Sequence, residues 1–344
     1  AFPMAGGDSC PNAVVPQNDR EADELLKKQE QQEQQPAEEA RGLNPLDPIY
    51  SEYDPKLKKY VYTRYFFNPK IDLDLESPAG PMRHTDKKFR EGLPLPNSAN
   101  VLSVKIVSSD YDYPLDVYGT VIARDNLDRH CVYLFRRGKD NCQSITSKDN
   151  SLILTGPKRG LLLCDSIFFE IDLKIKDLHG REIKDERLGK GLLELDGIIR
   201  QTSNVKHGVE KSTLVSMHST LDLSYAFVRN AVEGTVETRI LQGPVDFHGK
   251  IIASTTSVPC DIVLHDSKVN GLLTADDNRF IQTVRRIIGV SVDEMLLVTI
   301  TPEGGDEFSD CTVKFTPKLN SYDEKNIVCG NYKMQVKVIW SLLM

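Results

Sequence analysis

Apolar and polar residues alternate along much of the segment from Val101 to Lys176, and this two-residue period constrains the fold most. The clearest run is at its end, where isoleucine and leucine alternate with aspartate and lysine over residues 171–176. Successive side chains of a strand point to opposite faces, so one face of this strand should meet a core and the other water. A helix would need apolar residues every three or four positions instead.

The same pattern of short apolar runs and turn residues continues from residue 98 to the end of the chain. Many short strands at close spacing indicate an antiparallel β-sandwich, so the predicted fold class is all-β. One stretch, residues 275–288, has the pattern of a short helix. The predicted strands are 101–107, 116–123, 131–135, 151–155, 161–176, 192–199, 213–227, 231–241, 247–254, 260–265, 294–300, 311–316 and 332–340.

Two segments 130 residues apart are similar. Residues 115–123 (LDVYGTVIA) and 245–253 (VDFHGKIIA) share an aspartate, a glycine, an isoleucine and an alanine at matching positions. This repeat predicts two similar β halves, residues 98–205 and 206–344. The shared glycines, Gly119 and Gly249, interrupt strands, which is typical of a bulge or a close backbone approach.

The first 97 residues differ in composition from the rest. Residues 1–44 are rich in Glu and Gln with few large apolar side chains, which predicts a disordered tail or, alternatively, a partner-binding arm. Residues 45–97 combine prolines with aromatics, which predicts an extended arm packed on the sandwich. Its aromatics and lysines could also stack on nucleic acid, but the acidic run 72–76 argues against that use.

Composition restricts the classes of function. Hydrophobic residues make up 40% and charged residues 27% of the chain, and the net charge of -7 attracts neither nucleic acid nor an anionic membrane. No run is long enough for a transmembrane helix. The seven cysteines contain no C-x-x-C pair, which favours a cytoplasmic or nuclear protein. In a secreted protein, Cys131 could pair with Cys142 and Cys311 with Cys329, and a leader before Ala1 is left open.

A cluster of aspartates near the first two strands of the sandwich is the candidate metal site. Carboxylates on loops at one end of a sandwich hold calcium in modules of the C2 type. Aspartates at strand ends also have an ordinary role in turns. The five candidate calcium ligands are Asp110, Asp112, Asp116, Asp125 and Asp128.

No other pattern predicts catalysis or a cofactor. The basic segment 136–143 could hold a phosphate or an acidic partner, form a solvated hairpin, or pair an arginine with a nearby carboxylate. Residues 154–160 lack the spacing of a phosphate-binding loop and are interpreted as a turn. The seven histidines are scattered and no G-x-S-x-G elbow occurs, so the sequence predicts neither a zinc site nor an enzyme.

Several short motifs resemble the plant family defined by domain of unknown function 6598, which is expanded in grasses. They lie at residues 81–86, 115–125, 134–143, 152–160, 231–236 and 338–341. The resemblance covers about residues 80 to 344. Some members of that family are fused to a ribosome-inactivating domain, and the setting it implies is stress or defence. The family supplies no catalytic residues to transfer.

These observations predict a non-enzymatic β-sandwich that binds an unidentified partner, with a protein partner favoured. Two alternatives belong to other classes. One is a component of a ribosome-inactivating system that acts as an rRNA N-glycosidase, and the other is a calcium-dependent, C2-like membrane-binding module. A purely structural or oligomerising role is also open.

Overall fold

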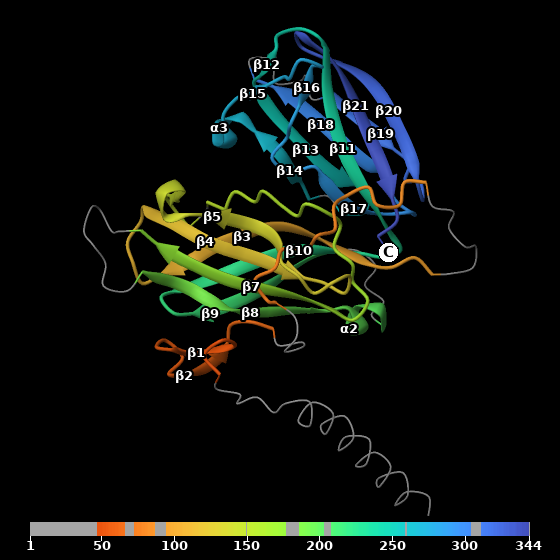
Figure 1. Cartoon of the computed structure of the whole chain (residues 1–344). Helices are drawn as coiled ribbons and strands as arrows, with labels where there is room; N and C mark the ends of the chain where they lie inside the picture. Colours follow the sequence, from red (N-terminus) through yellow and green to blue (C-terminus); the bar gives the residue numbers. More distant parts are fainter. Residues whose placement is uncertain are drawn as a thin grey trace, which may run out of the picture. The chain divides into compact units, whose positions relative to one another are not determined.

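The computed structural model describes residues 47–65, 72–86, 94–148, 150–176, 186–202, 208–258, 260–303 and 311–343. Residues 48–344 form one compact unit. It contains a β-hairpin and two antiparallel β-sandwiches, which confirms the predicted all-β class (Figure 1). The tail predicted at 1–44 lies outside the described residues.

The first sandwich comprises two sheets. The three-stranded sheet has the order β3-β10-β9, and the larger sheet has the order β5-β4-β7-β8, with β6 pairing with β4. The bounds are β3 (Ser98–Ser109), β4 (Leu115–Arg124), β5 (Val132–Arg137), η1 (Lys139–Asn141), β6 (Gln143–Ile145), β7 (Ser166–Ile175), β8 (Arg187–Asp196), α2 (Gly197–Thr202), β9 (Val209–Ser216) and β10 (Ser219–Val228).

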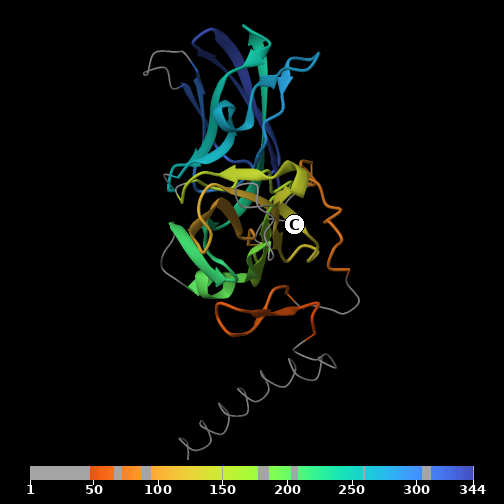
Figure 2. The same cartoon turned by 90° about the vertical axis from the view of Figure 1, so that its left-hand side faces the viewer.

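The second sandwich follows directly in the chain and appears in cyan to blue in Figures 1 and 2. Its sheets have the orders β16-β11-β21-β20, with β17 also on β11, and β14-β13-β18-β19, beside a small β12-β15 pair. The bounds are β11 (Ala231–Gln242), β12 (Asp246–Phe247), β13 (Gly249–Thr255), β14 (Ile262–Asp266), α3 (Ser267–Asn270), β15 (Leu273–Thr274), β16 (Phe280–Ile281), β17 (Ile287–Ser291), β18 (Leu296–Pro302), β19 (Cys311–Phe315), β20 (Ser321–Cys329) and β21 (Tyr332–Ser341).

The two sandwiches have the same strand order along the chain. Strands β3, β10 and β9 correspond to β11, β21 and β20, and β5-β4-β7-β8 corresponds to β14-β13-β18-β19. The division between them lies between Val228 and Ala231, because β10 pairs with both β3 and β9. A boundary at 205/206, which the repeat alone suggested, would separate β3 from the strands that complete its sheet.

Gly119 and Gly249 occupy equivalent places in β4 and β13. Their φ angles are +119° and +152°. A Cβ atom at Gly119 would lie 2.1 Å from the carbonyl oxygen of Asp172, and one at Gly249 would lie 2.3 Å from that of Thr301. The close backbone approach predicted from the repeat is therefore confirmed in both sandwiches.

The predicted helix at 275–288 is wrong. The Asp276 carboxylate accepts hydrogen bonds from the backbone N–H groups of Asn278 and Phe280 and so forms a turn. The residues that follow add β16 and β17 to β11. The run Ile287–Ser291 is buried at every position, and such a strand lacks the alternation that would have distinguished it from a helix.

Two further differences concern strands. The predicted strand at 151–155 is an irregular segment: the Gln143 side chain bonds to the Ser151 carbonyl and the Ile153 N–H, and an isolated bridge joins Ser151 to Lys105 on β3. The predicted strand at 213–227 is two strands with a turn between them. Strand β20 was not predicted, because most of its side chains are polar and at least partly exposed.

The segment before the sandwiches contains a hairpin, β1 (Ser51–Asp54) and β2 (Lys59–Tyr62), which lies on the first sandwich. Glu52 accepts hydrogen bonds from Arg187 (2.8 Å) and Lys190 (2.6 Å) on β8. The Asp54 carboxylate accepts one from the backbone N–H of Met217 at 2.9 Å. Residues 51–62 of the predicted arm therefore form a hairpin, where the sequence predicted an extended chain.

Candidate functional site

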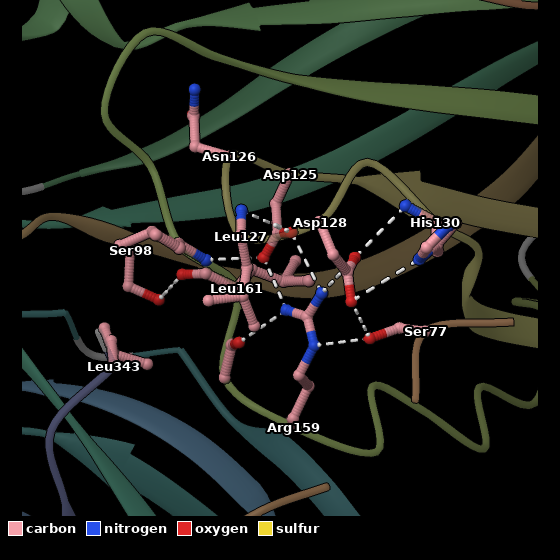
Figure 3. A network of polar contacts seen from close by, with 12 residues as sticks. Ser77, Ser98, Asp125, Asn126, Leu127, Asp128, His130, Arg159, Leu161 and Leu343 are labelled. Carbon is pink, nitrogen blue, oxygen red and sulfur yellow. Dashed lines mark hydrogen bonds and ion pairs between the residues drawn. The ribbon is translucent and has the colours of Figure 1, made fainter. Parts of the chain in front are cut away.

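Ser77, Asp125 and Asp128 surround the side chain of Arg159, which is fully buried (Figure 3). Its guanidinium is bidentate on Asp125, with Nη1 2.5 Å from Oδ2 and Nη2 3.0 Å from Oδ1. Nη2 also lies 3.2 Å from Asp128 Oδ1, and Nε donates to Ser77 Oγ at 3.1 Å. Burial lowers the pKa of Arg159, but the ion pair outweighs burial and raises it overall.

Glu233 at the start of the second sandwich joins three segments. Its Oε2 accepts from the Gly160 N–H at 2.6 Å, and its Oε1 accepts from the Met82 N–H at 2.7 Å. Nearby, the Arg83 guanidinium donates to the Leu343 carbonyl at 2.8 Å. Three of the motifs that resemble the family therefore meet here, and they connect the segment before residue 97 to both sandwiches.

A second buried ion pair holds the same segment from another side. Arg124 lies bidentate on Glu170, with Nε 2.6 Å from Oε1 and Nη2 2.9 Å from Oε2. Arg124 also donates to the Leu73 carbonyl at 2.6 Å, and Arg64 lies 3.5 Å from Glu170. The polar atoms of these side chains bond within the protein, so the two networks stabilise the fold and offer little to a ligand.

The five predicted calcium ligands do not come together. Asp125 and Asp128 face Arg159, and Asp110 lies 3.0 Å from Lys56 Nζ. Asp116 lies within β4 opposite Ser144, and Asp112 is exposed in the turn before β4. Among the described residues, no group of three or more His, Cys, Asp or Glu side chains could hold a metal ion. The placement of these residues gives calcium binding no support.

The basic segment 136–143 is engaged with neighbouring acidic and amide groups. Arg136 lies 3.7 Å from Glu76, and Lys139 lies 2.5 Å from Glu186. Arg137 Nη1 is 3.3 Å from the Asn141 side-chain oxygen within the same loop. The hairpin interpretation of this segment fits these contacts.

The described part of the chain contains a cleft of about 890 Å³ that both sandwiches line. The first sandwich contributes β3, β10 and the loops around β6, and the second contributes β14, α3 and residues 284–285. Two contacts fix the strands beside it: Asn100 on β3 donates to the Gly289 carbonyl and accepts from the Gly289 N–H, both at 2.8 Å. The cleft therefore lies between two sandwiches that hydrogen bonds hold together beside it.

Arg285 lines this cleft and is only 4% exposed. Its Nη2 donates to the Val101 carbonyl at 2.8 Å, and its buried Nε has no hydrogen-bond partner. No described carboxylate forms an ion pair with it, and burial lowers the pKa of Arg285 to about 10. The guanidinium therefore remains charged at neutral pH.

The sequence did not point to Arg285, because it lies in the stretch predicted as a helix and next to a second arginine, Arg286. Nothing in the sequence shows that one member of the pair is buried and the other is not. The sequence likewise does not show which residues of the first sandwich line the cleft. Their positions in strands and turns do not show which residues of the second sandwich lie opposite them.

Two sandwiches with one strand order, and a cleft between them that contains a buried arginine, define an all-β protein with a candidate binding site. The chain belongs to the family described as Domain of unknown function (DUF6598), whose model matches residues 98–338. The match begins at β3 and ends within β21, so it spans both sandwiches. No curated protein matches the chain.

Several solved structures of extended synaptotagmin 2 resemble the chain weakly. The fragment with the SMP domain and both C2 domains is 10% identical with a TM-score of 0.23, and the alignment covers 73% of this chain and 58% of that one. The fragment with the two C2 domains alone is 10% identical with a TM-score of 0.26, covering 80% of this chain and 100% of that one. At such TM-scores the similarity supports no conclusion about function.

Proposed function

We propose that this protein is a non-enzymatic binding module whose ligand occupies the cleft between its two sandwiches. The observation that carries the proposal is the cleft itself, about 890 Å³ in volume and lined by both sandwiches. Ligand pockets commonly have volumes of about 300–1,000 Å³ and lie where two domains meet. A partner protein could bind there by inserting a side chain or terminus.

The ionisable groups described above support binding rather than catalysis. Arg159, Asp125, Arg124 and Glu170 are paired with one another and with backbone groups. A general acid or base must reach a substrate proton, and a nucleophile needs an adjacent base. The described lining of the cleft contains two cysteines, Cys142 and Cys260, and two aspartates, Asp261 and Asp266, but no histidine or glutamate.

The family resemblance favours a plant stress or defence response as the setting of this binding. The absence of C-x-x-C pairs and the thiols of Cys131 and Cys142 favour the cytoplasm or nucleus. Among the described residues, no helix has the length and apolarity to cross a bilayer. Fractionation of plant tissue with an antibody against the chain would test the compartment.

Two matched valine-to-tryptophan variants test the binding site. Val269 on α3 lines the cleft and is 54% exposed, whereas Val328 on β20 is outside the cleft lining and is 68% exposed. Compounds from a metabolite library that raise the melting temperature of wild type should do so for Val328→Trp and not for Val269→Trp. Ligands that stabilise both variants equally would place the site elsewhere.

The non-enzymatic part of the proposal needs its own measurement. Each bound compound should be recovered chemically unchanged after prolonged incubation, as judged by mass spectrometry. Ribosomes incubated with the protein should release no adenine and yield no rRNA fragment after aniline treatment. Conversion of a ligand, or depurination of rRNA, would show that the protein is an enzyme.

A further inference from the structure

The cleft carries a positive charge that the protein as a whole does not. Four basic and two acidic side chains line it: Lys105, Arg137, Lys268, Arg285, Asp261 and Asp266. Asp266 accepts a hydrogen bond from the Lys268 N–H as the cap of α3, and Lys268 Nζ lies 3.9 Å from Glu303. The chain has a net charge of -7, so this local excess of cations is distinctive.

Arg285 is the least exposed of these four basic side chains. A charged group taken out of water is costly unless a partner of opposite charge compensates it. The Val101 carbonyl supplies one hydrogen bond, but Nε is buried without a partner. Arg285 lies on the wall of the cleft and has no carboxylate partner among the described residues, so an anion in the cleft would compensate its charge.

The remaining lining mixes apolar and polar side chains. The apolar ones include Leu102 and Val209 of the first sandwich, and Val263 and Val269 of the second. A bare inorganic anion would leave these surfaces in contact with water. An occupant with an apolar body covers them and gains the corresponding hydrophobic free energy.

We infer that the cleft recognises a small amphiphilic organic anion, with Arg285 binding its carboxylate, sulfonate or phosphate group and the leucine and valine side chains covering its apolar body. This inference rests on the proposed function, because it names the class of ligand that the cleft takes. Lys105 and Arg137 also line the cleft and add to the attraction for an anion, and Arg285 makes the direct contact.

Two fluorescent probes with the same aromatic body test the inference on the full chain. 1-Anilinonaphthalene-8-sulfonate carries a sulfonate, and N-phenyl-1-naphthylamine lacks it. Wild type should bind the sulfonate more tightly than the neutral probe. Arg285→Met should weaken sulfonate binding by about 10- to 100-fold, the usual value of a hydrogen bond to a charged group, and should leave the neutral probe unchanged.

Control variants separate recognition from folding. Arg285→Met replaces a buried charge with an apolar side chain of similar length, so the protein should fold. Arg285→Lys keeps the charge without the fork of donors and should restore part of the preference for the anion. Arg136→Met changes an arginine that is 62% exposed outside the cleft lining, and it should bind both probes as wild type does.

The outcomes distinguish the two proposals. Equal affinity of wild type for the two probes, or an equal weakening of both probes in folded Arg285→Met, would overturn the role of Arg285 as the contact for the anion. Sulfonate binding that persists in Val269→Trp would show that the probe sits elsewhere and would contradict the cleft as the site. A wild type that binds neither probe would overturn the inference about the ligand class.

Discussion

Arg159 and Asp125 form an ion pair in which neither side chain is exposed, with two nitrogen–oxygen contacts of 2.5 Å and 3.0 Å. The residues come from the loop before β7 and the end of β4, 34 positions apart in the chain. The Leu162 N–H also donates to Asp125 at 2.7 Å. The pair therefore holds the long β6–β7 connection against the sandwich.

Removing one member of this pair should destabilise the protein strongly. Arg159→Met leaves the Asp125 carboxylate buried without its counterion, and such changes cost about 3–5 kcal/mol. Urea unfolding would measure the loss. Lys158→Met is the matched control, because the adjacent Lys158 pairs with Glu76 at the surface, and it should cost less than about 1 kcal/mol. Equal effects of the two variants would contradict the assignment.

Glu233→Gln should loosen the attachment of residues 80–86. The glutamine oxygen can still accept one of the two hydrogen bonds. Its NH2 group would face the other backbone N–H donor, that of Met82 or of Gly160, and cannot accept from it. The expected loss is about 1–3 kcal/mol, the cost of an unsatisfied buried group. Hydrogen exchange at Met82 and its neighbours should become faster. Glu237→Gln, on the same strand β11, should leave that exchange unchanged.

Alanine at Gly119 or Gly249 should destabilise its own sandwich. The added Cβ would lie 2.1 Å or 2.3 Å from a carbonyl oxygen on the neighbouring strand, and the φ angles disfavour any L side chain. We expect a loss of roughly 1–3 kcal/mol at each position, measured by urea unfolding. Gly138→Ala, where no atom lies within 4 Å of the new Cβ, is the control. A similar loss in all three variants would refute the explanation.

Stability should fall in acid partly because of Asp128. Burial raises the pKa of Asp128, but a hydrogen bond from Ser77 and the charge of Arg159 outweigh burial and lower the pKa below its usual range. A carboxyl whose pKa is lower in the folded state stabilises the fold above the unfolded pKa, near 4, and loses that contribution as pH falls through the folded pKa. Asp128→Asn should therefore flatten the decline in the urea midpoint below pH 4. A decline as steep as that of wild type would show that Asp128 contributes nothing to it.

Much of the strand framework could be predicted because alternation is a local property. Ile171, Leu173 and Ile175 indicate a half-buried strand whichever strands lie beside them, and all three are buried in β7. The repeat likewise located Gly119 and Gly249, because a strained backbone position selects glycine wherever it occurs. The helix at 275–288 was wrong because a strand buried on both faces has no period to detect.

The candidate sites could not be predicted, since each depends on a pairing between distant segments. The sequence predicts Asp125 and Asp128 as calcium ligands, but Arg159 lies between them and pairs with both. An aspartate has the same identity beside a metal ion as beside a guanidinium, so the sequence cannot distinguish the two environments. Arg159, which pairs with both carboxylates, lies in the stretch 154–160 that the sequence predicts only as a turn.

The sequence by itself determined the all-β class, most of the strands, and the repeat and its glycines, because backbone sterics and the two-residue period act over a few neighbouring residues. Only the tertiary structure decided which charges neutralise one another and which cation is left on the wall of a cleft. Burial and Coulomb interactions depend on distances through space, and Arg285 meets Val101 across 184 positions of the chain. The alternation of side chains carries no information about such distances.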